Sequence, residues 1–179
     1  MAGLSEAPSR VAYIAASLDG FIATGDGGVG WLDAFQDHDY GYDAFFATVG
    51  VLVMGRATYD QVRGFGEWPY PERRCIVLTG RELVGAPPGV SAWPGDAASL
   101  AMHLAELPER VWIVGGGRLI AALLAEGAVT ELDLFIMPVL LGHGVPLFAG
   151  GHPPAQALRL LETRSWPNGV VRLRYSLNR

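Results

Sequence analysis

The chain contains no lysine, and all 13 of its basic residues are arginine. A Schiff-base lysine and a lysine general base are therefore excluded. Any proton transfer must use Asp, Glu, His, Tyr, Cys or water. Arginine stays protonated and grips phosphates or carboxylates with a forked guanidinium group. The sequence thus predicts fixed positive charges for anion binding and a different residue type for proton transfer.

Cysteine and long apolar runs are also scarce. The one cysteine, Cys75, excludes an intrachain disulfide and a metal site built on paired cysteines. It lies in a short apolar run, so we expect an inert core residue. No run is long and apolar enough to span a membrane, and the N-terminus lacks the pattern of a signal peptide. We therefore expect a cytoplasmic protein with no membrane partner.

Basic residues are fewer than acidic residues, 13 against 18. The net charge is -5 and the pI is about 5.3, which argues against a general nucleic-acid-binding protein. The 179 residues are 50% hydrophobic, enough for one good core. No repeat or linker divides the chain. We expect a flexible tail over residues 1–9 and a single domain over residues 10–179.

Strand and helix patterns alternate along most of the chain. Apolar runs predict strands at residues 11–17, 51–54, 75–78, 90–93, 111–114 and 132–139. Helices are predicted at residues 39–49, from residue 57, after an Asp96 N-cap, and at 118–126. The glycine-rich residues 21–32 read as a mobile loop, and residues 158–177 as a hairpin. This order predicts an α/β fold with a mainly parallel sheet and an antiparallel C-terminal edge.

Two strand-to-helix junctions carry both glycine and arginine. They are VLVMGRATYD at residues 51–60 and VWIVGGGRLIAALL at residues 111–124. Backbone N–H groups at a helix start, beside a fixed positive charge, form an anion site. Alone, either junction could be a plain strand end or a tightly packed turn. Together they favour a ligand with several phosphates, such as a dinucleotide, and hence a reductase.

Five ordered segments resemble the dihydrofolate-reductase-like superfamily. They are SLDGFIA, MGRATY, IVLTGR, VGGGRLIAALL and ELDLFIMPVLLGHGVPLF. The late segment resembles the reductase domain of the bifunctional riboflavin-biosynthesis deaminase/reductase more than true dihydrofolate reductases. The resemblance covers residues 11–177. It implies a central eight-stranded sheet flanked by helices, NADPH as hydride donor and a homodimer.

The resemblance also implies which residues hold the cofactor. They lie at strand ends, helix starts and the lid over the nicotinamide: Ala15, Ile22, Gly55, Arg56, Thr58, Leu78, Thr79, Arg81, Val114, Gly116, Gly117, Arg118 and Leu119. Arg81 would bind the adenosine 2′-phosphate and so favour NADPH over NADH, although it could also be a solvated loop charge. A cis peptide bond is implied between Gly115 and Gly116.

The resemblance implies a carboxylate on the first helix, which serves the pterin in true dihydrofolate reductases. Counting back from Gly55 points to Asp39 as the catalytic residue, with Asp33, Asp37 and Asp43 as rivals. Asp39 could equally be a helix N-cap. Two aromatic residues are candidates for the substrate pocket or, alternatively, for core packing: Trp31 and Tyr42.

Other polar residues carry weaker signals. A phosphorylated substrate would need an arginine grip from Arg63, Arg73 or Arg74, which otherwise read as surface charges. His143 fits a structural role better than a catalytic one. The zinc signature of a deaminase is absent, so we expect a stand-alone reductase rather than the bifunctional enzyme.

The sequence therefore predicts an NADPH-dependent reductase that transfers hydride to a C=N or C=O bond of a small heterocyclic or sugar-like substrate. Two alternatives stay open. One is a nucleotide-binding or regulatory protein that keeps the cofactor cradle without turnover. The other is a true dihydrofolate reductase, whose turnover would depend on Asp39.

Overall fold

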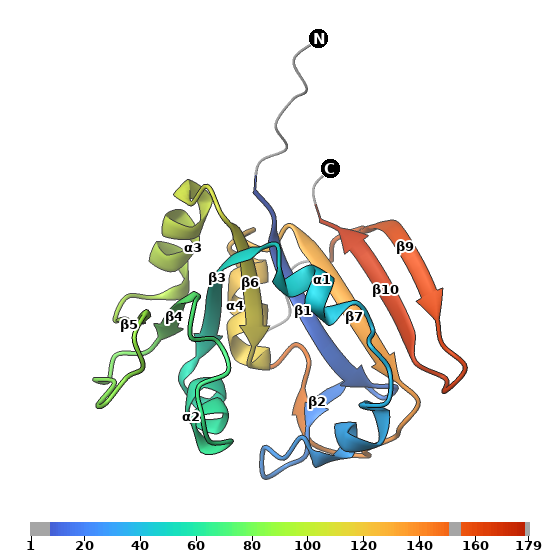
Figure 1. Ribbon diagram of the computed structural model, residues 1–179. Helices are drawn as coiled ribbons and strands as arrows, with labels where there is room; N and C mark the ends of the chain where they lie inside the picture. Colours follow the sequence, from blue (N-terminus) through green and yellow to red (C-terminus); the bar gives the residue numbers. More distant parts are fainter. Residues whose placement is uncertain (1–7, 151–154, 178–179) are drawn as a thin grey trace.

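The computed structural model describes residues 8–150 and 155–177 and has an α/β architecture (Figure 1). Its strands are β1 (Arg10–Ser17), β2 (Phe21–Ala23), β3 (Val49–Gly55), β4 (Arg74–Leu78), β5 (Val90–Trp93), β6 (Arg110–Gly115), β7 (Glu131–Met137), β8 (Val145–Pro146), β9 (Arg159–Ser165) and β10 (Val171–Ser176). Its helices are the 3-10 helix η1 (Gly30–Phe35) and the α-helices α1 (Tyr42–Phe46), α2 (Arg56–Gly64), α3 (Ala97–Glu106) and α4 (Gly117–Ala125).

The main sheet has eight strands in the order β5-β4-β3-β6-β1-β7-β10-β9. The strands from β5 to β7 pair in parallel, and β10 runs antiparallel to both β7 and β9. The predicted fold class, a mostly parallel mixed sheet with an antiparallel C-terminal edge, is therefore confirmed. The carboxyl ends of β1, β3, β4 and β6 meet at one edge of the sheet, where the predicted junctions lie.

Both faces of the sheet are covered, because strand residues alternate between two apolar clusters. On β1, Ala12 and Ala16 join the cluster that contains residues of α3 and α4, whereas Val11 and Tyr13 join the one with residues of α1 and α2. On β6, Trp112 faces the α1 side. Buried strands with apolar residues on both faces are typical of parallel sheets between helices.

Two sequence-based boundaries are wrong. Residues 21–32 contain β2 and the start of η1, because β2 pairs with β8 far along the chain. The helix expected over residues 39–49 is only α1, since Gly41 precedes it with a φ of 89° and Val49 already belongs to β3. Most of the expected tail, residues 1–7, lies outside the described residues, while the Ser9 carbonyl accepts a hydrogen bond from Val111 N–H at 3.0 Å.

Other local features agree with the sequence. Asp96 caps α3 by accepting a hydrogen bond from Ser99 N–H at 2.8 Å. Strands β9 and β10 form the expected hairpin, and β9 is the outer strand of the sheet. Three leucines at or next to β9 are exposed: Leu158, Leu160 and Leu161. Within the described ranges, no helix has the length and apolar character needed to cross a membrane.

Candidate active site

The two glycine–arginine junctions lie next to each other at the carboxyl edge of the sheet. Helices α2 and α4 start from Gly55 and Gly116, and neither of these N-cap residues makes a side-chain capping bond. A Cβ built at Gly116 would lie 3.3 Å from Thr58 Oγ1 of α2. Uncapped N–H groups from two neighbouring helix starts are an arrangement suited to an anionic ligand.

The glycine triplet shapes the start of α4. Gly115 and Gly116 have φ values of 140° and 44°, which side chains rarely adopt. The cis peptide expected between them is wrong, since the described residues contain no cis bond; the positive φ at both glycines makes the turn with a trans peptide. A Cβ at Gly117 would clash with the carbonyl oxygen of Pro146 in β8. The third glycine thus allows close packing of α4 against β8.

The arginines around these junctions differ in how far they are engaged. Arg56 binds Asp60 through Nε at 2.8 Å and donates to the Glu82 carbonyl at 3.2 Å, so its charge is partly compensated. Arg81 and Arg118 are exposed. Thr79 is buried after β4, and its hydroxyl accepts a hydrogen bond from Arg81 N–H at 3.1 Å. This bond fixes the loop from which Arg81 projects.

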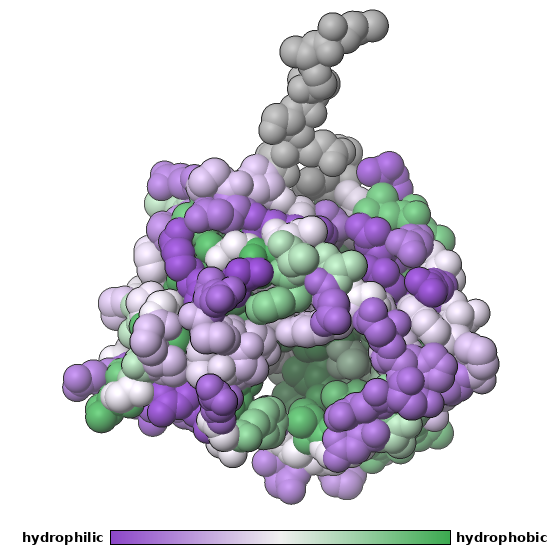
Figure 2. All heavy atoms as spheres, viewed as in Figure 1, coloured by the Kyte–Doolittle hydropathy of each residue, from purple (hydrophilic) through white to green (hydrophobic). Residues whose placement is uncertain are grey.

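A cavity of about 950 Å³ opens on the α1 side of the sheet, and we call it the aromatic cavity. Figure 2 shows it as a hollow with hydrophobic walls bordered by polar residues. Ala15 of β1 and Val114 of β6 line it, which brings it beside the glycine triplet. Seven aromatic side chains line it: Tyr13, Phe35, Tyr40, Tyr42, Tyr70, Trp112 and Phe135.

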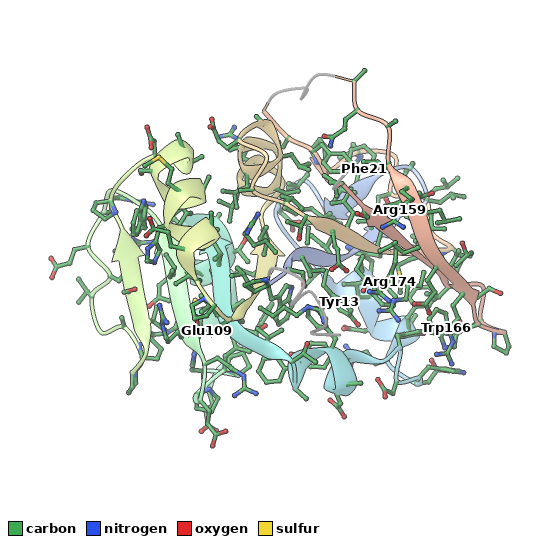
Figure 3. The ribbon with its side chains drawn as sticks, turned by 90° about the horizontal axis from the view of Figure 1, so that it is seen from above. Tyr13, Phe21, Glu109, Arg159, Trp166 and Arg174 are labelled. Atoms are coloured by element: carbon green, nitrogen blue, oxygen red, sulfur yellow. The ribbon has the colours of Figure 1, made fainter. Side chains whose placement is uncertain are left out.

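Trp112 is the centre of the aromatic wall. Its indole Nε1–H donates to the Tyr13 carbonyl at 3.1 Å, which fixes the ring orientation. Its ring centroid lies 5.9 Å from that of Tyr42 and 5.7 Å from that of Tyr70, both edge-on. Tyr13 lies between the sheet and α1 in Figure 3 and stacks on Phe45 at 4.1 Å. These contacts hold the walls in defined positions.

Asp39 is the one of the four candidate carboxylates that lines the aromatic cavity. Its Oδ1 accepts hydrogen bonds from Gly41 N–H at 2.8 Å and Tyr42 N–H at 3.0 Å. Asp39 therefore anchors the turn before α1, a role similar to the N-cap role that the sequence also allowed. Its Oδ2 is left for a ligand. The rivals lie outside the lining: Asp33 binds Gln36, Asp37 contacts His38, and Asp43 is exposed on α1.

The tyrosine hydroxyls are further hydrogen-bond donors of the cavity. Burial raises the pKa of Tyr13 and of Tyr70 well above the usual range, so both hydroxyls stay protonated near neutral pH. Burial also raises the pKa of the Cys75 thiol to about 12, which agrees with an inert core residue. The described residues hold no cluster of His, Cys, Asp or Glu able to bind a metal ion.

Several other predicted residues lie apart from the lining. Trp31 packs against the core on the α1 side, whereas its helix neighbour Leu32 lines the cavity. Ile22 of β2 packs against the opposite cluster. His143 lies beside Gly25, and its expected structural role stays a prediction.

The three arginines considered for a phosphate grip are also absent from the lining. Arg63 donates to the Tyr59 hydroxyl and the Gly85 carbonyl. Arg74 pairs with Glu109 at 3.0 Å. Arg73 stacks over the Phe46 ring at 4.9 Å.

Sequence reasoning missed most of the cavity wall. Tyr13, Tyr70, Trp112 and Phe135 come from three strands and a loop that are distant in sequence. One available signal was strand alternation, because residue 112 must face the side opposite to the buried residues 111 and 113.

Comparisons with known proteins agree with this architecture. The model of the RibD C-terminal domain family matches residues 93–172. The uncharacterized protein YwjB of Bacillus subtilis (strain 168) is 38% identical over 141 residues, which cover 77% of this chain and 81% of that protein.

Two solved structures have a similar fold. One is a Shewanella sp. PV-4 protein assigned to riboflavin biosynthesis, with 29% identity, a TM-score of 0.82 and coverage of 96% of this chain and 99% of that chain. The other is the Thermotoga maritima diaminohydroxyphosphoribosylaminopyrimidine deaminase/5-amino-6-(5-phosphoribosylamino)uracil reductase, with 16% identity and a TM-score of 0.69. It shares the fold; the match covers 96% of this chain and 57% of that one.

Proposed function

The chain belongs to the RibD C-terminal domain family, whose fold is dihydrofolate-reductase-like, and on that premise we propose that it is an NADPH-dependent reductase of a small heterocyclic or sugar-like substrate. One observation carries the proposal. Two uncapped helix starts lie side by side at the edge of the sheet, directly beside a large cavity that can hold a second ligand.

The residues present fit this cofactor. The N–H groups at the starts of α2 and α4, with the Thr58 hydroxyl between them, would bind the pyrophosphate. Exposed Arg81, on a loop fixed by Thr79, would bind the 2′-phosphate, while Arg118 adds positive charge at the start of α4. The absence of a Cβ at Gly116 leaves room for close backbone approach.

NADPH supplies the hydride when it is bound, and the protein must position the acceptor and deliver a proton. Ala15 and Val114 border the part of the aromatic cavity nearest the glycine triplet, so the reacting carbon belongs there. The aromatic walls exclude water around it. Asp39 Oδ2 would accept a hydrogen bond from a ligand N–H or relay a proton from water to the reduced heteroatom, and the tyrosine hydroxyls would donate hydrogen bonds to the ligand.

The first test is a titration of the protein with NADPH and with NADH, followed through quenching of its five tryptophans. We expect NADPH to bind at least about tenfold more tightly than NADH, since one charge-assisted phosphate contact is worth about that factor. Arg81→Ala should weaken NADPH binding toward the NADH value. The control is Arg74→Ala. Arg74 is the first residue of β4, is exposed and pairs with Glu109, so its removal should leave both affinities unchanged.

The outcomes separate the proposed function from its alternatives. If the protein binds neither NADPH nor NADH, the proposal that it is a reductase is refuted. NADPH binding without oxidation across a broad substrate panel would instead support a regulatory nucleotide-binding protein. Reduction of dihydrofolate that Asp39→Asn abolishes would identify a true dihydrofolate reductase.

A further inference from the structure

The charges around the aromatic cavity differ from those of a phosphate-binding site. Within the part of the chain that the structure describes, no arginine lines the cavity, and the chain has no lysine. We propose that the aromatic cavity binds a planar nitrogen heterocycle that carries no phosphate group. This inference rests on the proposed function in taking the aromatic cavity as the substrate site, and it narrows the substrate class.

Two arginines stack on aromatic rings at or near the cavity wall, and neither is part of the cavity lining. Arg172 binds Asp133 through Nε at 2.7 Å and through its NH2 group at 2.6 Å, and its guanidinium lies over the Phe135 ring at 5.4 Å. Its charge is therefore compensated by a buried carboxylate. Arg73 lies over Phe46, a ring outside the cavity lining. Neither arginine contributes to the cavity lining, so neither offers a free positive charge there.

The acidic stretch of chain that contains Asp39 would repel an anion. Asp33, Asp37, Asp39 and Asp43 all lie within eleven residues, in a stretch without arginine. Asp39 lines the cavity with Oδ1 held by two backbone N–H groups. A ring N–H or amino group of a heterocycle could donate to Oδ2, whereas a phosphate dianion would meet like charge there.

The walls favour a flat ligand. Trp112 is fixed by its bond to the Tyr13 carbonyl, and Tyr42 and Tyr70 stand edge-on to it. Rings held in this way offer faces and edges against which another ring can stack. The cavity volume of about 950 Å³ lies at the upper end of the range of small-molecule sites, so a heterocycle of two or three rings fits beside a nicotinamide.

Calorimetric titration of the cofactor-free protein with matched pairs tests this inference. The probes are uridine against uridine 5′-monophosphate and riboflavin against flavin mononucleotide, which differ within each pair by one phosphate. We expect at least one unphosphorylated member to bind, and to bind at least about tenfold more tightly than its phosphorylated partner. Asp39→Asn should weaken that binding about tenfold. The Asn oxygen can still accept the two backbone bonds, so the turn before α1 is kept.

A charge-gain variant provides the matched control. Gln36 is exposed and lines the cavity, so Gln36→Arg should shift the preference toward the phosphorylated probes. Ala34→Arg, also exposed and in η1 but outside the lining, should not.

Three outcomes would overturn the inference: equal or tighter binding of the phosphorylated probes by the unmodified protein, failure of every probe to bind, or an equal effect of the two arginine variants. Because these titrations contain neither NADPH nor NADH, they are independent of the NADPH titration, whose failure would refute the proposed reductase function.

Discussion

The ion pair between Asp133 and Arg172 gives a prediction whose size follows from its burial. Asp133 is 1% exposed on β7, and Arg172 on β10 binds both of its carboxylate oxygens. The hydrogen bonds to Asp133 raise the pKa of Arg172 above its already high value, so the guanidinium stays charged. Arg172→Leu would leave the buried carboxylate without its main partner.

The expected cost comes from the desolvation of that carboxylate. Breaking a buried ion pair by removing one partner typically costs about 3–5 kcal/mol. Arg174 Nε lies 3.6 Å from Asp133 Oδ2 and remains as a weaker partner, so we place Arg172→Leu at the lower end of that range. Replacing both residues by leucine removes both desolvation penalties, and the double variant should lie within about 1 kcal/mol of the unmodified protein.

A double-mutant cycle measures this coupling. Urea unfolding followed by tryptophan fluorescence gives the free energy of unfolding for the four proteins. We expect a coupling energy of at least about 2 kcal/mol between residues 133 and 172. The exposed pair Arg74–Glu109, with side chains 53% and 36% exposed, is the control and should couple by less than about 1 kcal/mol. Equal coupling in the two cycles would refute the buried-charge argument.

Two further predictions concern the α4 junction and the outer strand. Gly117→Ala should destabilise the fold by about 1–3 kcal/mol and weaken NADPH binding, because the new Cβ clashes with the Pro146 carbonyl. Gly64→Ala, where a Cβ meets no atom within 4 Å, is the control for urea unfolding and nucleotide titration and should be neutral or slightly stabilising. The homodimer implied by the family resemblance predicts a mass near twice 19.1 kDa by light scattering. We propose that the exposed leucines of the outer strand β9 form its interface, so Leu160→Glu should halve that mass. Val84→Glu, at an exposed valine away from β9, should leave the mass unchanged; a monomeric unmodified protein would contradict the dimer.

The parts of the fold that were predictable from the sequence carry strong local signals. Apolar runs mark the central strands, and Asp96 and the turn before residue 170 mark a helix start and a hairpin. Strand β2 was missed because its partner β8 is a two-residue strand about 120 residues away, a pairing without local signature. Helix α1 was overextended because aromatic spacing alone does not show that a strand begins at Val49.

The candidate site also contains parts that the sequence predicted and parts that it did not. The glycine–arginine junctions were predictable because the glycine and arginine of each junction are consecutive in the sequence. The cavity wall was not, because Trp112 and Tyr70 meet only through tertiary packing. Asp39 was placed by counting from Gly55, but the fact that it anchors a turn and also faces the cavity follows from its hydrogen bonds.

The central position of β1 in the sheet has a consequence for folding during synthesis on the ribosome. Its two neighbours, β6 and β7, begin pairing with it at Val111 and Glu131, so β1 stays without a paired strand until about a hundred more residues have emerged. At typical rates of synthesis this interval is about 5–20 s. During that time β1 has no strand to pair with, and the sheet can close only late, through contacts of high sequence separation.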